Sequence, residues 1–223
     1  MNIKFSVIMP CYNSELWVKN ALDSIKNQTY PHWELIVVND GSKDNTPDIL
    51  NEYAESDERI KVFSKENGGY VSAVNYGLDK ITGDYFLFLG SDDVLDKGLF
   101  EKLYENICKI SFIPDVINFR TVKVIDGEMS GIDEYTAFET TMYSNDSSLK
   151  EYSEKYPEHS LSLFFRDTSK CFKTSLLGEL RYFGKYGIDA DGIFSMLFCH
   201  KAGSFLSVSY NGYFWTLRGD SVS

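Results

Sequence analysis

Two adjacent aspartates, Asp92 and Asp93, follow the short apolar segment Tyr85–Leu89. Carboxylates grouped at the end of a strand bind hard divalent cations such as Mn²⁺ or Mg²⁺, which take further ligands from water and substrate phosphates. An acidic turn that only caps the following helix would use the same residues. Three other polar clusters end similar apolar segments. Because Asp92 and Asp93 are accompanied by these other polar strand ends, a metal site is favoured over a simple helix cap.

A third carboxylate, Asp40, lies in a Asn-Asp-Gly-Ser motif in which glycine and serine permit a tight turn. Asp40 could accept hydrogen bonds from a base or ribose, or it could merely close the turn. Further along, Gly68 and Gly69 follow Asn67, and such glycines allow a ligand to approach the backbone closely. The chain has neither a P-loop lysine nor a GxGxxG motif, which argues against ATPase and dehydrogenase functions.

These polar clusters each end an apolar segment. The four segments are Phe5–Met9, Glu34–Val38, Ile60–Phe63 and Tyr85–Leu89. Near-continuous apolar segments separated by helical patterns are typical of parallel strands buried on both faces. Because ligands bind beyond the carboxyl ends of such strands, we expect the four clusters to meet in one crevice.

Helical patterns alternate with these segments. The expected helices span residues 14–27, from 44 onward, 69–81 and 98–110. Ser14 is the predicted N-cap of the first helix, Leu16 belongs to its apolar stripe, and Pro47 suits the first turn of the second. The order βαβαβαβα predicts right-handed crossovers and a parallel sheet.

The pattern changes in the second half of the chain. Asp115–Ile125 is rich in β-forming residues, and residues 126–128 predict a turn between two antiparallel strands. Ser130–Ser160 shows no clear period, which predicts a mobile loop or an irregular surface segment. A helix near Asp191–Lys201 and a β-rich tail at Ser204–Leu217 complete the expected domain.

Composition is typical of a soluble globular enzyme: 223 residues, of which 43% are hydrophobic, suit one domain. With 33 acidic and 22 basic residues the net charge is −11, so neither nucleic acid nor an anionic membrane is an expected non-specific partner. The four cysteines show no CxxC spacing, which predicts reduced and mostly buried thiols in a cytosolic protein. No signal peptide or membrane-spanning segment is recognisable, and no zinc signature either.

Four motifs, in order and with compatible spacing, resemble the glycosyltransferase family 2 nucleotide-sugar transferases. The motifs are Ser6–Asn13, Val38–Thr46, Asn67–Gly69 with Ala73–Gly77, and Leu89–Asp93. The resemblance implies the GT-A fold, a Rossmann-like α/β fold with a mostly parallel central sheet flanked by helices and a smaller antiparallel β-containing C-terminal subregion. It also implies sugar transfer from a nucleoside diphosphate sugar, usually with inversion, aided by Mn²⁺ or Mg²⁺.

Residues of the nucleotide site are implied by the same resemblance. Those similar to residues that line the uridine site are Pro10, Tyr12, Asp40 and Asn67. Near the end of the sequence, residues 213–221 resemble the closing Tyr-Arg-x-x-x-Ser pattern of the family. Arg218 of this pattern is expected to hold the pyrophosphate as the leaving group forms.

The DxD position of the family is occupied by Gly90, Ser91 and Asp92, with glycine in place of the first aspartate. Asp92 is therefore the expected metal ligand, with Asp93 beside it and Ser91 at the nucleotide. The departure at Gly90 implies weaker nucleotide or metal binding.

The catalytic base in this family belongs to a late Glu-Asp pair that begins a helix and is followed by an aromatic residue. Asp191 fits this position by its spacing to Phe194, with Ala190 in place of the glutamate and Asp189 as the reserve candidate. A carboxylate that only stabilises the helix N-terminus would have the same position.

We therefore expect a metal-dependent, inverting transferase of the hexosyl or N-acetylhexosaminyl type. Its donor would be a UDP-sugar, and its acceptor a glycan or lipid-linked hydroxyl in bacterial-type polysaccharide, teichoic acid or glycolipid synthesis. Residues 1–223 would form a single domain, with a nucleotide-sugar-binding half at 1–110 and an acceptor-binding half at 111–223. A cytoplasmic enzyme with peripheral association at the inner membrane face would suit that role.

Two other functions compete with this interpretation. A degenerate module that keeps the fold and binds nucleotide sugars without catalysis is suggested by Gly90 and Ala190. A sugar nucleotidyltransferase would require a glycine-rich loop with basic residues after the first strand, and Pro10–Asn13 offers neither feature.

Overall fold

The computed structural model describes residues 2–132, 141–144, 167–184 and 190–217. The strands are β1 (Phe5–Cys11), β2 (Trp33–Asn39), β3 (Ile60–Ser64), β4 (Tyr85–Phe88), β5 (Val94–Leu95), β6 (Val116–Ile125), β7 (Glu128–Ile132), β8 (Thr141–Ser144), β9 (Lys170–Lys173) and β10 (Ser204–Leu217). The helices are α1 (Val18–Lys26), α2 (Thr46–Ser56), α3 (Tyr70–Leu78), α4 (Leu99–Cys108) and α7 (Ala190–Lys201), with a short 3₁₀ turn at Thr174–Leu176.

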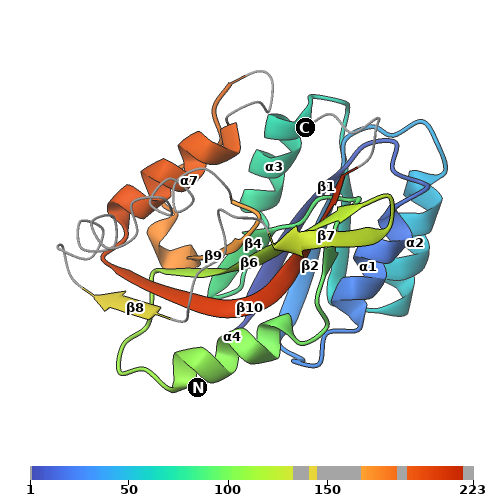
Figure 1. Cartoon of the computed structure of the whole chain (residues 1–223). Helices are drawn as coiled ribbons and strands as arrows, with labels where there is room; N and C mark the ends of the chain where they lie inside the picture. Colours follow the sequence, from blue (N-terminus) through green and yellow to red (C-terminus); the bar gives the residue numbers. More distant parts are fainter. Residues whose placement is uncertain (1, 133–140, 145–166, 185–189, 218–223) are drawn as a thin grey trace.

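The ten described strands join in one sheet with the order β3-β2-β1-β4-β9-β6-β10-β5, while β7 pairs with β6 and β8 with β10. β3, β2, β1 and β4 are parallel, and Phe5 of β1 lies in register with Trp33 and Tyr85 on either side. β9 runs antiparallel to both β4 and β6. The predicted α/β fold with a parallel first half and an antiparallel β-containing second half is confirmed (Figure 1).

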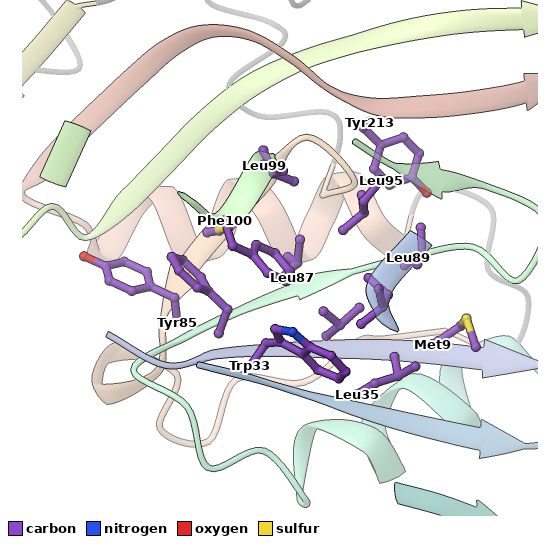
Figure 2. Packing of buried hydrophobic residues seen from close by; sticks show 14 of the residues in the cluster. Met9, Trp33, Leu35, Tyr85, Leu87, Leu89, Leu95, Leu99, Phe100 and Tyr213 are labelled. Carbon is purple, nitrogen blue, oxygen red and sulfur yellow. The ribbon is translucent and has the colours of Figure 1, made fainter. Parts of the chain in front are cut away.

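Side chains of the central strands alternate between two buried faces, because successive residues of a strand point to opposite sides. Phe5, Val7 and Met9 of β1 pack in one cluster with Leu22 of α1 and Phe100 of α4. Figure 2 shows this cluster, in which Met9, Trp33, Leu35 and Leu87 lie together beneath Leu95, Leu99 and Phe100. The rings of Phe5 and Phe100 stack at 4.9 Å.

The opposite face of the sheet packs against α3 and α7. Ile8 of β1 joins Val74 of α3 and Phe194 of α7 in a second buried cluster. At its centre the ring of Phe172 lies 4.8 Å from Phe198 and 5.6 Å from Phe194, so β9 and α7 are locked together. This double coverage explains why the strands read as near-continuous apolar segments.

A buried acidic side chain sits in β2 between two lysines. Glu34 is 1% exposed and accepts hydrogen bonds from Lys4 (2.9 Å) and Lys61 (2.8 Å). Burial would by itself raise the pKa of Glu34, but these bonds and those from Ser6 and Thr82 outweigh it and lower the pKa to about 2. The carboxylate therefore ties the amino-terminal ends of β1, β2 and β3 together.

The start of α1 differs from the prediction. α1 begins at Val18, and Trp17 rather than Ser14 is its N-cap. The Ser14 hydroxyl instead donates to the Tyr12 carbonyl (3.3 Å) and shares a hydrogen bond with Ser91 (2.8 Å). Leu16, predicted to lie on the apolar stripe, precedes the helix and is 74% exposed.

The other predicted elements are confirmed with shifted ends, and α2 carries Pro47 in its first turn. The predicted β6–β7 hairpin turns at Asp126 and Gly127, both at positive φ (49° and 84°), as a two-residue type I′ turn requires. β5 is an addition that the sequence did not reveal, because two residues give no period. Most of Ser130–Ser160 lies outside the described residues. Within this segment the structure describes only the end of β7 and the backbone of β8.

The cysteines are free thiols, with Cys11, Cys171 and Cys199 buried and Cys108 exposed, in agreement with the prediction. Among the described residues, every helix is too short or too polar to cross a membrane.

Candidate active site

The four polar clusters meet in one pocket of about 470 Å³, as the sequence predicted. We call it the strand-end pocket; its lining residues are Pro10, Cys11, Tyr12, Asp40, Asn67, Gly69, Tyr70, Ala73, Gly90, Ser91 and Asp92. Its volume falls in the range of small-molecule sites. The pocket therefore contains five of the six residues expected at the nucleotide, and Arg218 lies outside the described residues.

Asp40 organises the loop between β3 and α3. The Asp40 carboxylate accepts hydrogen bonds from Lys65 Nζ (2.6 Å) and from the backbone N–H groups of Gly68 (3.0 Å) and Gly69 (2.7 Å). Gly69 has a φ of 81°, and Gly41 has a φ of 76° with its α-carbon so close to Asn67 N that a Cβ would lie 2.8 Å from it. Asp40 thus presents the Asn67–Gly69 backbone to the pocket.

Hydrogen bonds also join the loops that follow β1 and β2. The Asn13 amide oxygen accepts from Lys43 N (2.8 Å), and the Ser42 hydroxyl accepts from Asn13 N (3.0 Å). Together with the Ser14–Ser91 bond, these contacts connect three strand ends through their side chains. These side-chain hydrogen bonds therefore hold the loops of the pocket wall together.

The two aspartates after β4 have different surroundings. Asp92 lines the strand-end pocket beside Ser91. Asp93 is 6% exposed and does not line the pocket; its carboxylate accepts hydrogen bonds from the Tyr213 hydroxyl (2.6 Å) and Thr216 N (2.8 Å). Asp93 therefore anchors β10 behind the pocket, and Asp92 is the one of the two carboxylates that lines it.

Gly90 lies close to both carboxylates. A Cβ at this position would lie 2.6 Å from Asp93 Oδ2 and 3.0 Å from Asp92 Oδ1. The Gly90 N–H donates to the Tyr213 hydroxyl (3.1 Å), so the backbone cannot easily move away. The glycine in the DxD position thus matches the local packing of this chain.

Asp191 lies in the first turn of α7, where the helix dipole favours a negative charge. It does not line the strand-end pocket, but its charge reaches Tyr70, which does. Tyr70 as a whole is 41% exposed, yet burial around its hydroxyl, followed by the charges of Asp167, Asp191 and Asp93, raises its pKa well above the usual value. The negative charges of three aspartates therefore act on Tyr70.

The later part of the third motif has a structural role. Asn75 Nδ2 donates to the Tyr182 carbonyl (3.0 Å), and Tyr182 N donates to Asn75 Oδ1 (2.8 Å). A Cβ at Gly77 would lie 2.6 Å from Ile8 Cγ2. Gly77 thus allows α3 to approach β1, rather than a ligand to approach the backbone, while Asn75 fixes the segment that leads toward α7.

The carboxylates of the strand-end pocket suit a cation whose other ligands come from the phosphates of the substrate. Among the residues that the structure describes, no group of three or more His, Cys, Asp or Glu side chains could enclose a metal ion. A Mg²⁺ or Mn²⁺ ion that also binds substrate phosphates needs only one or two protein carboxylates. Asp92 would supply one of them. An anionic diphosphate beside Asp92 would also need a positive charge to offset the repulsion.

Sequence reasoning missed several residues of the site. Lys65 acts through the carboxylate of Asp40, and Asp167 lies buried near Asp191 without belonging to any motif. Tyr213 begins the closing pattern at residues 213–221, but its contact with Asp93 was not predicted. Tyr70 could have been found, because it directly follows the glycine pair of the third motif. The others depend on contacts between residues far apart in the chain.

The chain is similar to known glycosyltransferases. The family described as "Glycosyl transferase family 2" matches residues 6–172. The chain is 34% identical over 187 residues to glycosyltransferase GlyA of Streptococcus pneumoniae, and 42% identical over 112 residues to the putative teichuronic acid biosynthesis glycosyltransferase TuaG of Bacillus subtilis. These alignments cover 83% and 48% of this chain, but only 27% of GlyA and 44% of TuaG.

A similar structure is that of S. aureus TarS 1–349 in complex with UDP-GlcNAc. It superimposes with a TM-score of 0.81 at 26% sequence identity, over 98% of this chain and 60% of TarS 1–349. The same fragment is also known in complex with UDP, with a TM-score of 0.78.

Proposed function

Because the chain belongs to glycosyltransferase family 2, we propose that it transfers a sugar from a UDP-sugar to an acceptor hydroxyl. The strand-end pocket is the proposed donor site, since all four motif-bearing strand ends line it. The likeness to TarS, whose structure holds UDP-GlcNAc, supports a uridine nucleotide as the donor carrier. The convergence of the four motifs in one pocket is the observation that carries this proposal.

In the proposed donor complex, Pro10, Tyr12 and Asn67 line the uridine end of the pocket. Asp40 holds the Asn67–Gly69 backbone in place through the bonds to Gly68 and Gly69. Its own carboxylate is 3% exposed, so it acts on the nucleotide from the edge of the site. Arg218 remains our candidate for the pyrophosphate.

Asp92 would hold Mn²⁺ or Mg²⁺ together with the donor diphosphate. When bound, the ion would neutralise negative charge on the departing UDP. Asp92 then has a positioning task, because it fixes the diphosphate relative to Ser91 and the strand-end backbone. Asp93 supports this loop from behind through Tyr213 and Thr216.

Asp191 is the proposed general base. Its carboxylate would take the proton of the acceptor hydroxyl while the hydroxyl oxygen attacks the anomeric carbon and the bond to the diphosphate breaks. A single displacement of this kind inverts the anomeric configuration. Asp191 lies in the first turn of α7 and its charge reaches Tyr70 of the donor pocket, so we propose that the acceptor enters on the α7 side of this pocket.

The experiment that tests this proposal is turnover of UDP-sugars, followed as UDP release with Mn²⁺ present and with chelator. UDP-GlcNAc is the first donor to test, because TarS 1–349 is known in complex with it. Metal-dependent UDP release that requires both an acceptor and Asp191 supports transfer. Folded protein that binds UDP-sugars without turning over any of them would favour the degenerate binding module.

The degenerate module is the second candidate, since Gly90 and Ala190 replace acidic residues of the family pattern. The packing around Gly90 weakens this argument, because the glycine fits the positions of Asp92 and Asp93. We propose polysaccharide, teichoic acid or glycolipid synthesis as the setting, with a glycan or lipid-linked acceptor. The name of TuaG, a putative teichuronic acid biosynthesis glycosyltransferase, supports a polysaccharide setting.

A further inference from the structure

Asp167 is a buried carboxyl group that the proposed reaction leaves without a role. It lies three residues before β9 and is 1% exposed. Neither of its carboxyl oxygens has a hydrogen-bond partner in the described part of the chain. An ionised carboxylate in such surroundings is costly, so burial favours the neutral acid.

Four elements bring charged or titratable groups toward Asp167. Asp191 approaches from α7 and Lys170 from β9, and both change the pKa of Asp167. Tyr70 of α3 and Tyr213 of β10 also lie within reach, because the charge of Asp167 helps to raise the pKa of each. Asp167 is thus close enough to interact electrostatically with both the proposed base and a tyrosine of the donor pocket.

Burial raises the pKa of Asp167 to about 8, and the negative charge of Asp191 acts in the same direction. The charge of Lys170 and the backbone N–H groups of Asp167 and Thr168 lower it, although none of them meets the geometry of a hydrogen bond to the carboxyl oxygens. Burial and the charge of Asp191 thus both favour the protonated acid at Asp167. Asp191, half-buried in the first turn of α7, has the helix dipole in its favour and is the better candidate for the charged group.

We propose that Asp167 is a positioning residue of the transfer reaction that acts through Asp191, remaining an uncharged acid so that Asp191 is the ionised carboxylate of the pair. This inference rests on the proposed function, in which Asp191 receives the acceptor proton. Asp167 neither gains nor loses a proton during transfer. If Asp167 ionised, a second negative charge would stand beside Asp191 and Tyr70 and would repel the anionic donor.

The first test is the pH dependence of transfer in wild type and in Asp167→Asn, which is uncharged at every pH and close in shape. We expect kcat/KM of the wild type to fall above about pH 8, and the variant to match the wild type at pH 7 but to lack this alkaline fall. Asp79→Asn removes a charge from an exposed ion pair with Arg181 and should keep the wild-type profile. An unchanged alkaline fall in Asp167→Asn, or a loss of activity at pH 7 of the size expected for a missing base, about 100-fold or more, would overturn the proposal.

The second test needs no substrate. A folded-state pKa above the unfolded value means that the folded protein keeps its proton while the unfolded chain loses it, so stability falls as pH rises toward the folded pKa. Asp167→Asn should therefore gain stability relative to wild type between pH 5 and 8, seen as a growing difference in urea midpoint, with no further gain above pH 8. A difference that is constant with pH would contradict a neutral Asp167.

The two tests separate two kinds of failure. A pH-dependent stability difference without any sugar transfer by the wild type would contradict the proposed function while leaving Asp167 neutral. Transfer by the wild type with a constant stability difference would contradict the inference about Asp167 alone.

Discussion

The Tyr213 hydroxyl donates a 2.6 Å hydrogen bond to the Asp93 carboxylate and accepts one of 3.1 Å from Gly90 N. These two bonds join β10, near the end of the described chain, to the loop that carries the proposed metal ligand Asp92. The two residues are 120 positions apart in the sequence. The second half of the chain therefore completes the site that the first half builds. Removal of the Tyr213 hydroxyl should affect both the stability of the fold and the loop that carries Asp92.

Tyr213→Phe leaves the buried Asp93 Oδ2 and Gly90 N without their partner. We expect a loss of about 1–3 kcal/mol in the free energy of unfolding and weaker UDP binding, measured by urea denaturation and calorimetry. Tyr210→Phe is the matched control, because Tyr210 lies on the same strand and donates to Asp96 from a partly exposed position. Equal effects of both substitutions on UDP affinity would contradict a specific role for Tyr213.

Asp191→Asn should abolish transfer and leave donor binding nearly intact. Loss of a general base costs about 10²–10⁴-fold in rate, and Asp191 does not line the strand-end pocket. The change in kcat is to be measured as UDP release at saturating donor and acceptor, alongside UDP affinity. Wild-type turnover in this variant would remove Asp191 from the mechanism.

Gly90→Ala should destabilise the fold by about 1–3 kcal/mol, because a new methyl group would overpack the site beside Asp93. Gly90→Asp restores the acidic DxD pattern in sequence, but we expect weaker Mn²⁺-dependent UDP binding, since a third carboxylate would crowd Asp92 and Asp93. Gly203→Ala is the control, as its Cβ would meet only Asp115 at 3.8 Å. Tighter metal-dependent binding by Gly90→Asp would show that Asp92 and Asp93 can move aside.

Glu34→Gln should cost about 2 kcal/mol of stability at neutral pH, since the charged bonds to Lys4 and Lys61 are lost and both lysines are partly exposed. The folded-state pKa of Glu34 is lowered to about 2, so this contribution is present above the unfolded pKa and disappears as pH falls from about 4.5 to 2. Urea denaturation at pH 7 and pH 3 measures the difference. Glu101→Gln, at an exposed carboxylate bonded to Thr29, should change little at either pH.

The sequence was most informative where local pattern and burial agree. β1, β2 and β4 are covered on both faces, so their apolar segments were readable and the polar residues at their ends fell into one pocket as predicted. Ser14 shows where such reasoning fails: its type and place suit an N-cap, but its hydroxyl is engaged by Ser91 from another strand end. Local rules carry no information about such partners.

The same limit applies within the candidate site. Asp92 and Asp93 are neighbours in sequence, yet only contacts with β10 separate the pocket-lining carboxylate from the buried anchor. Asp167 has no motif around it, and the charged or titratable groups that act on it, Asp191 and Lys170, come from α7 and β9. Residues whose role depends on distant elements could not be assigned before the fold was known.

The most direct test of the proposed donor site is calorimetric titration of UDP into wild type and Asp92→Ala, with Mn²⁺ present and then chelated. We expect the wild type to bind UDP only with Mn²⁺ present and Asp92→Ala to lose this binding, while Asp79→Ala binds as the wild type does. Binding that is indifferent to both Mn²⁺ and Asp92, or no binding by folded wild-type protein, would contradict a metal-dependent UDP-sugar site at the strand-end pocket.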